Sequence, residues 1–317
     1  MIAGARIVSP CDNPRMLINE NIRKCVAFAG VRGPSDYTIL GTAFFVVHRI
    51  EGTDMHELYM ATARHVVESA WEKSIDGAAY FRLNEKAGTS TWVRIPRGDW
   101  EFHEDDKIDA AIGRLHCLGD DDFVEKFDHS AVGEEMFLTQ EAIEGLRIRP
   151  GENLFFPGLF CRFPGNQANL PILRTGTIAA LPTEQTRTSR GLARVYLAEL
   201  RSIGGHSGSP VFVHLDHEAW LQAVRSEEFK NSRYLESYPF LGMVHGFFPI
   251  RADQFAPIVS DGSTETAARA EDYNSGIAAI VPASDIMHVL HQPALLDSRR
   301  ITSEEIIRKR TGPTTET

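Results

Sequence analysis

The sequence predicts an all-β protein built as two β-barrels in tandem. The first two-thirds of the 317-residue chain consist of short apolar runs, rich in β-branched and aromatic residues and separated by Gly, Pro and Asp. Strands do not alternate with helices, which argues against a doubly wound parallel sheet. An acidic stretch, 119–135, separates two groups of expected strands, and this division suggests two barrels.

The expected strands before the acidic stretch are 25–30, 37–47, 57–62, 78–82, 90–95 and 108–115. Those of the second group are 135–138, 154–160, 171–181, 192–200, 210–215, 240–247 and 276–281. Helical periodicity is confined to 16–23, 219–229, 284–291 and 303–308. We therefore expect an N-terminal extension (1–24), a first barrel (25–125), a second barrel with a closing helix (126–292) and a C-terminal tail (293–317).

Composition excludes several classes of partner. Hydrophobic residues make up 43% of the chain and charged residues 24%, enough to build a globular core. A net charge of −10 argues against binding to nucleic acid, which depends on clustered cations. No apolar run reaches the roughly 18 residues that span a bilayer, and no secretory signal is visible. The sequence predicts a cytoplasmic protein that binds neither nucleic acid nor a membrane.

The four cysteines are Cys11, Cys25, Cys117 and Cys161. They form no C-x-x-C pair and no Cys/His pattern at zinc spacing, so we interpret them as reduced thiols. The sequence predicts neither a metal nor a cofactor.

Three short segments carry the residue types that nucleophilic catalysis requires. His65 follows an apolar strand, Asp109 opens an apolar run, and Ser207 lies within 204–210 (GGHSGSP). A serine hydroxyl needs a base and oxyanion donors, and neighbouring glycines allow a turn that points successive N–H groups at one spot. Alone, each segment also fits an ordinary structural role. The order His, Asp, Ser is that of the chymotrypsin-type barrels.

These segments resemble those of trypsin-like (chymotrypsin-fold) serine peptidases of the bacterial-type branch. Residues 62–65 (TARH) are similar to the family's T-A-x-H, 109–111 to its D-x-A, and 205–210 to its G-x-S-G-[GS]-P. Three flanking strands agree, so that the resemblance covers about residues 38–292. It implies two six-stranded antiparallel Greek-key barrels with a C-terminal helix and a few inserted surface helices.

The resemblance also implies a serine endopeptidase acting on polypeptides. Ser207 would attack the scissile carbonyl, His65 would take its proton, and Asp109 would hold the His65 tautomer. Backbone N–H groups of Gly205 and Ser207 would form the oxyanion hole.

The substrate pocket would be built from Arg201, Ser202, His245 and Gly246. A donor on His245, aided by Arg201, would favour an acidic residue before the cut. The alternative is a small or apolar pocket, with His245 packed and Arg201 in solvent.

Departures from the family leave other functions open. His206 replaces the aspartate that receives a cut N-terminus, and the 32 residues after Asp285 leave no room for a C-terminal peptide-binding domain. An α/β-hydrolase would need a G-x-S-x-G motif followed by a helix. Here Ser209 stands in place of the second glycine, and Pro210 begins an expected strand. A catalytically idle binding module is one alternative. Another is a protease switched by a regulatory protein partner through 119–135, 219–229 or 260–273, which otherwise are solvated insertions.

Overall fold

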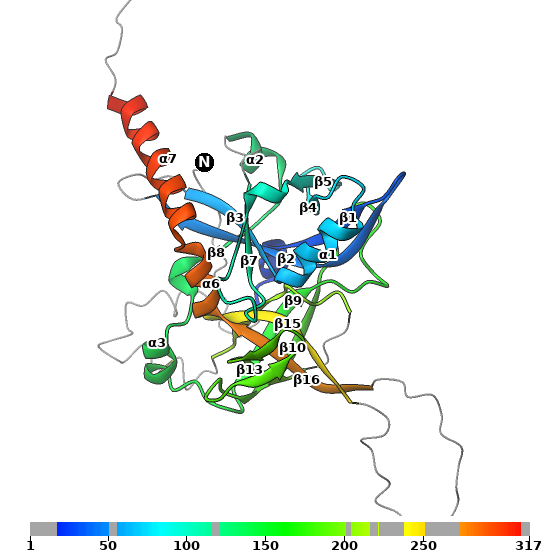
Figure 1. Cartoon of the computed structure of the whole chain (residues 1–317), viewed down its shortest axis with the longest axis vertical. Coiled ribbons are helices and arrows are strands. Elements are labelled where there is room, and N and C mark those ends of the chain that lie inside the picture. The colour runs from blue at the N-terminus through cyan, green and yellow to red at the C-terminus, as the bar shows by residue number, and fades with distance from the viewer. Residues whose placement is uncertain are drawn as a thin grey trace, which may run out of the picture.

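The protein contains two β-assemblies, one from each half of the chain. The structure is a computed structural model that describes residues 18–50, 56–115, 121–200, 204–215, 221, 238–250 and 273–311. Figure 1 shows the sheet of the N-terminal half above the barrel of the C-terminal half. Two helices, α6 (Ala283–Leu290) and α7 (Pro293–Thr311), run along one side of both.

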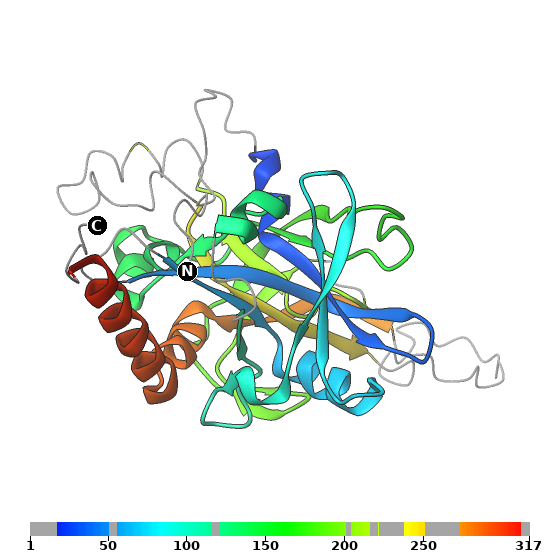
Figure 2. The same ribbon diagram turned by 90° about the horizontal axis from the view of Figure 1, so that it is seen from above.

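The first assembly is a curled sheet, whose strands are β1 (Val26–Arg32), β2 (Tyr37–Arg49), β3 (His56–Thr62), β4 (Ala79–Asn84), β5 (Ser90–Ile95), β6 (Trp100–Phe102), β7 (Ala111–Arg114) and β8 (Val132–Gly133). Their order is β5-β4-β1-β2-β3-β7-β6, and β8 pairs with β2 in parallel. Among the described residues this sheet curls without closing, whereas a closed six-stranded barrel was expected (Figure 2).

The second assembly is a closed barrel of six antiparallel strands, as predicted. It consists of β9 (Asn153–Gly158), β10 (Ile172–Ala180), β13 (Tyr196–Glu199), β14 (Pro210–Val213), β15 (Phe240–Ile250) and β16 (Tyr273–Pro282). The order around the barrel is β10-β13-β16-β15-β14-β9. A small hairpin, β11 (Thr186–Thr188) and β12 (Gly191–Ala193), extends from it. The all-β, two-barrel class predicted from the sequence is thus confirmed.

The helices differ more from the expectations. Besides α6 and α7 they are α1 (Arg64–Lys73), α2 (Asp121–Lys126), α3 (Gln140–Gly145) and the 3₁₀ turns η1 (Glu20–Cys25), η2 (Arg97–Asp99) and η4 (Glu134–Met136). The predicted helix 284–291 is confirmed as α6. The predicted strand 135–138 is wrong, because η4 occupies its first half. Helix α7 fills most of the expected tail, and the expected helix 219–229 lies outside the described residues except for Leu221.

Aromatic side chains join the two assemblies into one core. Phe44 of β2 lies 5.4 Å from Phe240 of β15, ring centre to ring centre, and both are fully buried. Phe155 and Phe212 stack at 5.3 Å just beyond them. Burying such large side chains contributes about 1.5–3 kcal/mol each. The core therefore fixes how the N-terminal sheet sits on the barrel.

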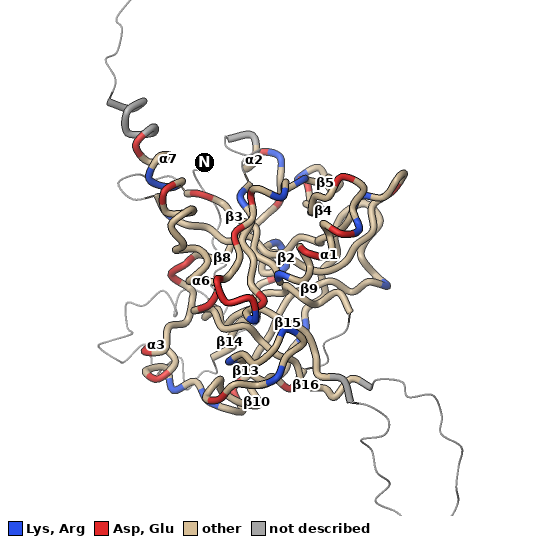
Figure 3. The backbone as a smooth tube through the Cα atoms, viewed as in Figure 1, with Lys and Arg blue, Asp and Glu red and all other residues tan. Residues whose placement is uncertain are grey.

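The surface carries charges of both signs. Figure 3 shows Lys or Arg beside Asp or Glu on α1 and on α7, where Arg300 pairs with Glu304 at 2.9 Å. Exposed pairs of this kind contribute little to stability. Among the described helices, none combines the length and apolar character needed to span a bilayer.

Candidate active site

Strand pairing brings His65 and Asp109 to one edge of the first sheet. Strands β3 and β7 are antiparallel, with Thr62 opposite Ala111, so the end of β3 lies beside the start of β7. His65 follows Thr62 in the first turn of α1, and Asp109 precedes Ala111. The helix buries Val66, Val67 and Ala70 against the sheet, which holds the His65 backbone in place.

Asp109 holds His65 at two points. The His65 backbone N–H donates to Asp109 Oδ1 at 2.9 Å, and Nδ1 lies 2.6 Å from Oδ2. The Asp109 side chain is 1% exposed, whereas that of His65 is 38% exposed. Burial alone raises the pKa of Asp109, but hydrogen bonds and charge from His245 and His65 outweigh it and hold that pKa well below its usual range. Asp109 is therefore a carboxylate, which makes Nδ1 of His65 the protonated nitrogen.

Ser207 lies on a turn that only glycine can complete. Gly208 has φ +87°, and a Cβ there would lie 1.9 Å from the carbonyl oxygen of Thr42. The Gly208 N–H donates to the Val244 carbonyl of β15 at 2.8 Å, while the Thr42 N–H donates to the Ser207 carbonyl at 3.0 Å. The nucleophile candidate is thus held between β2 of the sheet and β15 of the barrel.

Thr42 also holds the other end of this turn. Its hydroxyl donates to the Gly205 carbonyl at 2.8 Å and accepts from the Leu159 N–H at 2.9 Å. Gly205 has φ +99°. Within the described part of the chain, neither the Gly205 N–H nor the Ser207 N–H donates to a protein acceptor. Thr42 lies within the expected strand 37–47, but no local pattern marks it as a site residue.

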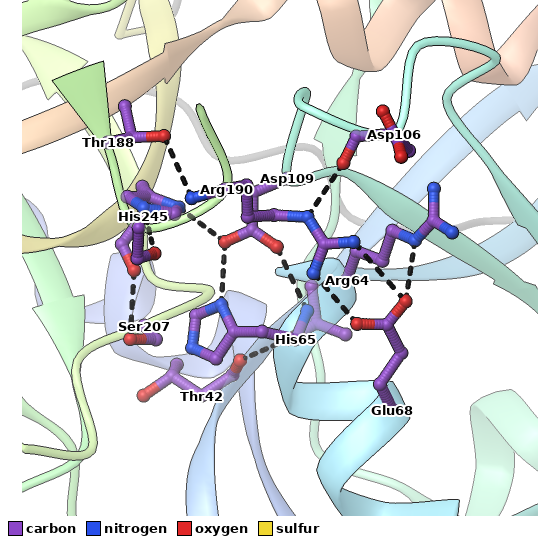
Figure 4. A network of polar contacts seen from close by, with 12 residues as sticks. Thr42, Arg64, His65, Glu68, Asp106, Asp109, Thr188, Arg190, Ser207 and His245 are labelled. Atoms are coloured by element: carbon purple, nitrogen blue, oxygen red, sulfur yellow. Dashed lines mark hydrogen bonds and ion pairs between the residues drawn. The ribbon is translucent and has the colours of Figure 1, made fainter. Parts of the chain in front are cut away.

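The Ser207 hydroxyl makes its hydrogen bond with a residue other than His65 in this structure. It donates to the backbone carbonyl of His245 at 3.0 Å. Figure 4 shows the His65 ring between Asp109 and the Ser207 side of the site. His245 links the two ends of the network, because its own ring contacts Asp109.

His245 differs from its expected role as a pocket donor. Its Nδ1 lies 2.5 Å from Asp109 Oδ2, and its Nε2 lies 3.0 Å from the Ser189 hydroxyl. Both ring nitrogens therefore have partners within the protein, and donation from His245 to a substrate carboxylate stays a prediction. Asp109 thus receives two imidazoles on one oxygen, an arrangement the sequence did not reveal.

An ion-pair network links the two assemblies beside the site (Figure 4). Glu68 of α1 accepts from Arg64 at 2.7 Å and from Arg190 of the β11–β12 turn at 2.7 Å. Arg190 Nε also donates to the backbone carbonyl of Asp106 at 2.8 Å. Burial raises the pKa of Glu68, but the two arginines outweigh it and lower that pKa overall. The hairpin of the barrel is thereby fastened to the helix that carries His65.

The remaining predicted site residues fall in different places. Arg201 and Ser202 lie outside the described residues. Gly246 is half-buried, with no atom within 4 Å of where a Cβ would lie. His206 is fully buried with its ring 5.2 Å from that of Phe156, and burial together with the charge of Arg174 lowers its pKa to about 4. His206 is therefore neutral near pH 7 and does not act as an ion-pair partner for a charged N-terminus.

Comparisons with known proteins give structural likenesses only. No family model matches the sequence, and no curated protein matches it. The chain is similar to the MamO protease domain from Magnetospirillum magneticum, at 14% identity and a TM-score of 0.45, over 86% of this chain and 99% of that one. It is also similar to Rv3671c from M. tuberculosis, solved as a serine-to-alanine mutant in an inactive form, at 14% identity and a TM-score of 0.42, over 89% of this chain and 96% of that one. Since both scores lie below 0.5, the two-barrel fold rests on this chain's own strand order.

Proposed function

We propose that this protein is a serine endopeptidase that uses Ser207, His65 and Asp109. The single observation that carries the proposal is that the buried Asp109 contacts His65 twice, at its backbone N–H and at its ring Nδ1. With its proton on Nδ1, the His65 ring offers Nε2 as a base. A half-exposed histidine fixed in this tautomer beside a glycine-framed serine suits acyl transfer.

In the proposed mechanism, Ser207 Oγ attacks the scissile carbonyl and its proton passes to His65 Nε2. The negative charge of Asp109 then stabilises the imidazolium, and this effect is strong because the carboxylate is 1% exposed. The Gly205 and Ser207 N–H groups would receive the oxyanion. His65 next donates its proton to the leaving amine, and water hydrolyses the acyl-enzyme by the same steps.

The hydrogen bond from Ser207 to the His245 carbonyl favours a second candidate, a protease whose resting state is switched by a partner or by substrate. Rotation about the Cα–Cβ bond of Ser207 would release this bond and turn Oγ toward His65. Catalytic hydrogen bonds are often long or misaligned without substrate. The idle binding module remains the alternative from another class.

Covalent labelling with a fluorophosphonate tests the proposal, because the probe reacts with a serine that is activated by its base. We expect the full chain to be labelled and Ser207→Ala to abolish labelling, with a loss of kcat of about 10⁶-fold on a peptide substrate. Ser209→Ala is the matched control, since it removes a buried hydroxyl two residues away and should keep labelling. A folded chain that resists the probe would contradict a constitutive peptidase and favour the idle or switched protein.

A further inference from the structure

A second group of imidazoles and a carboxylate lies near the C-terminal end of β2, beyond Thr42 in the middle of that strand. His48 Nδ1 is 2.8 Å from Glu134 Oε2, and His291 Nε2 is 3.5 Å from the same oxygen. The three ligand atoms lie within 4.8 Å of one another. None of these residues takes part in the proposed peptidase reaction, and they lie 86 and 157 positions apart in the chain.

The fold places these residues together from three separate elements. Strands β2 and β8 pair in parallel with Val47 beside Gly133, so the next residues, His48 and Glu134, are neighbours. His291 is the C-cap of α6, at the junction with α7. Figure 1 shows these helices running along the side of the first sheet.

The orientation of His48, rather than the distances, argues against an ordinary hydrogen bond in this group. The buried Nδ1 of His48 finds no acceptor with hydrogen-bond geometry, even though Glu134 Oε2 is 2.8 Å away. Zinc binds imidazole nitrogen and carboxylate oxygen at about 2.0–2.2 Å, which sets ligand atoms about 3.3–3.6 Å apart at tetrahedral angles. The separation of 3.5 Å between His291 and Glu134 falls in that range, whereas the 2.8 Å between His48 and Glu134 is shorter and would lengthen by about 0.5 Å on binding. The rings of His48 and His291 lie edge to face, at 83° to each other and with their centres 6.4 Å apart.

The surroundings suit a structural metal. Glu134 is 18% exposed and His291 is 48% exposed, so water can complete the coordination from the open side. Arg299 of α7 lies 3.9 Å from the other Glu134 oxygen and donates to the Tyr59 hydroxyl at 2.8 Å. A cation that faces the free oxygen of a ligating carboxylate orients it, as second-shell partners commonly do.

We propose that His48, Glu134 and His291 form a binding site for a divalent transition-metal ion of the zinc class, which fastens the α6–α7 junction to the first sheet. Imidazole and carboxylate ligands favour such ions over Mg²⁺ and Ca²⁺, which prefer all-oxygen sites. The metal plays no part in peptide hydrolysis. Coordination by the metal would connect the first sheet to the junction of α6 and α7 more rigidly than the side-chain contacts alone.

The test is a titration of the metal-stripped, tag-free full chain with ZnCl₂ by calorimetry, with Co²⁺ absorption as a second readout. We expect one saturable site, a rise in Tm with Zn²⁺, and no response to Mg²⁺. His291→Gln and Glu134→Gln should each weaken Zn²⁺ binding by more than the roughly 10–100-fold cost of losing an outer-shell partner. His288→Gln is the matched control, because that half-exposed histidine lies on the same helix and faces Glu104 instead; it should bind as the parent does.

Zinc binding at the other His–carboxylate–His group would be a different result, and His65→Gln identifies it. If saturable binding survives His291→Gln and Glu134→Gln but is lost in His65→Gln, the proposal is overturned. It is equally overturned if the parent chain shows no saturable Zn²⁺ binding. Retained binding in His65→Gln, together with loss in His291→Gln, supports the site at Glu134. These outcomes do not depend on whether the protein cleaves peptides.

Discussion

Two carboxylates in this protein are each approached by two imidazoles, and the two groups differ in spacing and burial. Asp109 has His65 and His245 at 2.6 and 2.5 Å and is 1% exposed. Glu134 has His48 and His291 at 2.8 and 3.5 Å and is 18% exposed. The contacts at Asp109 are short and shielded from water, whereas those at Glu134 are longer and open to water on one side.

The comparison teaches that residue type alone does not assign chemistry to such a group. At Asp109, hydrogen bonds and charge from two close imidazoles outweigh burial, keep the carboxylate charged and fix the tautomer of His65. At Glu134, three elements meet at the surface, and the group stabilises their arrangement. Substitution of Asp109 should therefore lower catalysis, whereas substitution of Glu134 should weaken metal binding and leave catalysis nearly unchanged.

The largest expected effect separates the two carboxylates. Asp109→Asn should lower kcat by about 10⁴-fold, because the amide favours the wrong His65 tautomer. Glu134→Gln should leave kcat nearly unchanged. Asp106→Asn should do the same, because only an exposed side chain changes and the backbone carbonyl of that residue still accepts from Arg190. Steady-state kinetics on one peptide substrate measure all three. Comparable losses in Asp109→Asn and Asp106→Asn would show that the acid has been misassigned.

His245 tests what the second imidazole contributes at Asp109. His245→Leu removes one donor, so that of the two imidazoles only His65 still contacts Asp109 and the carboxylate is less firmly oriented. We expect kcat to fall by up to about 100-fold through lost positioning. We also expect the acid limb of the pH–rate profile to move to higher pH, because the less satisfied carboxylate stabilises the imidazolium more.

A purely structural role for His245 would lower kcat without moving that limb. His245→Asn is the matched variant, since its amide can still donate toward Asp109. It should recover part of the rate and return the acid limb toward that of the parent. An acid limb that is the same in all three proteins would contradict a positioning role for His245.

His206 is a buried histidine outside both groups, and it gives a smaller effect that appears in stability. Its pKa is lowered to about 4 in the folded protein, against about 6.5 when unfolded. The unfolded chain therefore binds more protons between these values, so stability is complete above pH 6.5 and declines as pH falls toward 4. At pH 5 the contribution of His206 is a loss of about 2 kcal/mol. Urea unfolding at pH 7.5 and 5.0 should show this loss in the parent but much less of it in His206→Gln; an equal pH difference in both would contradict it.

Local motifs explain what the sequence could predict about the site. His65, Asp109 and Ser207 each sit in a short segment whose neighbours mark its chemistry, and the structure brings them into one hydrogen-bonded network. His245 contacts Asp109 across 136 positions, and no local pattern announces such a contact. The group around Glu134 could not be predicted either, because its three residues lie far apart in the sequence. Metal-ligand spacing is recognisable only when the ligands lie close together in the chain.

The fold was predictable where periodicity was strong and less so at short elements. The closed barrel follows from alternating strands, whereas helix α1 lacks a side-chain N-cap at Ala63 and was missed despite the apolar spacing of Val66, Val67 and Ala70. Pro293 at the start of α7 is a typical helix-start signal, and the helix continues to Thr311. Residues 134–136 form a 3₁₀ turn although 135–138 reads as a strand, because short apolar runs fit either structure.

The place of β16 in the barrel has a consequence for how the protein is made. This strand lies between β13 and β15, yet it is the last of the described strands to leave the ribosome. Chains are synthesised from the N-terminus at about 5–20 residues per second, so His65 and Asp109 emerge many seconds before the barrel around Ser207 can close. Under the proposed function, each newly made copy would therefore remain inert while its own unfolded segments are still exposed to cleavage.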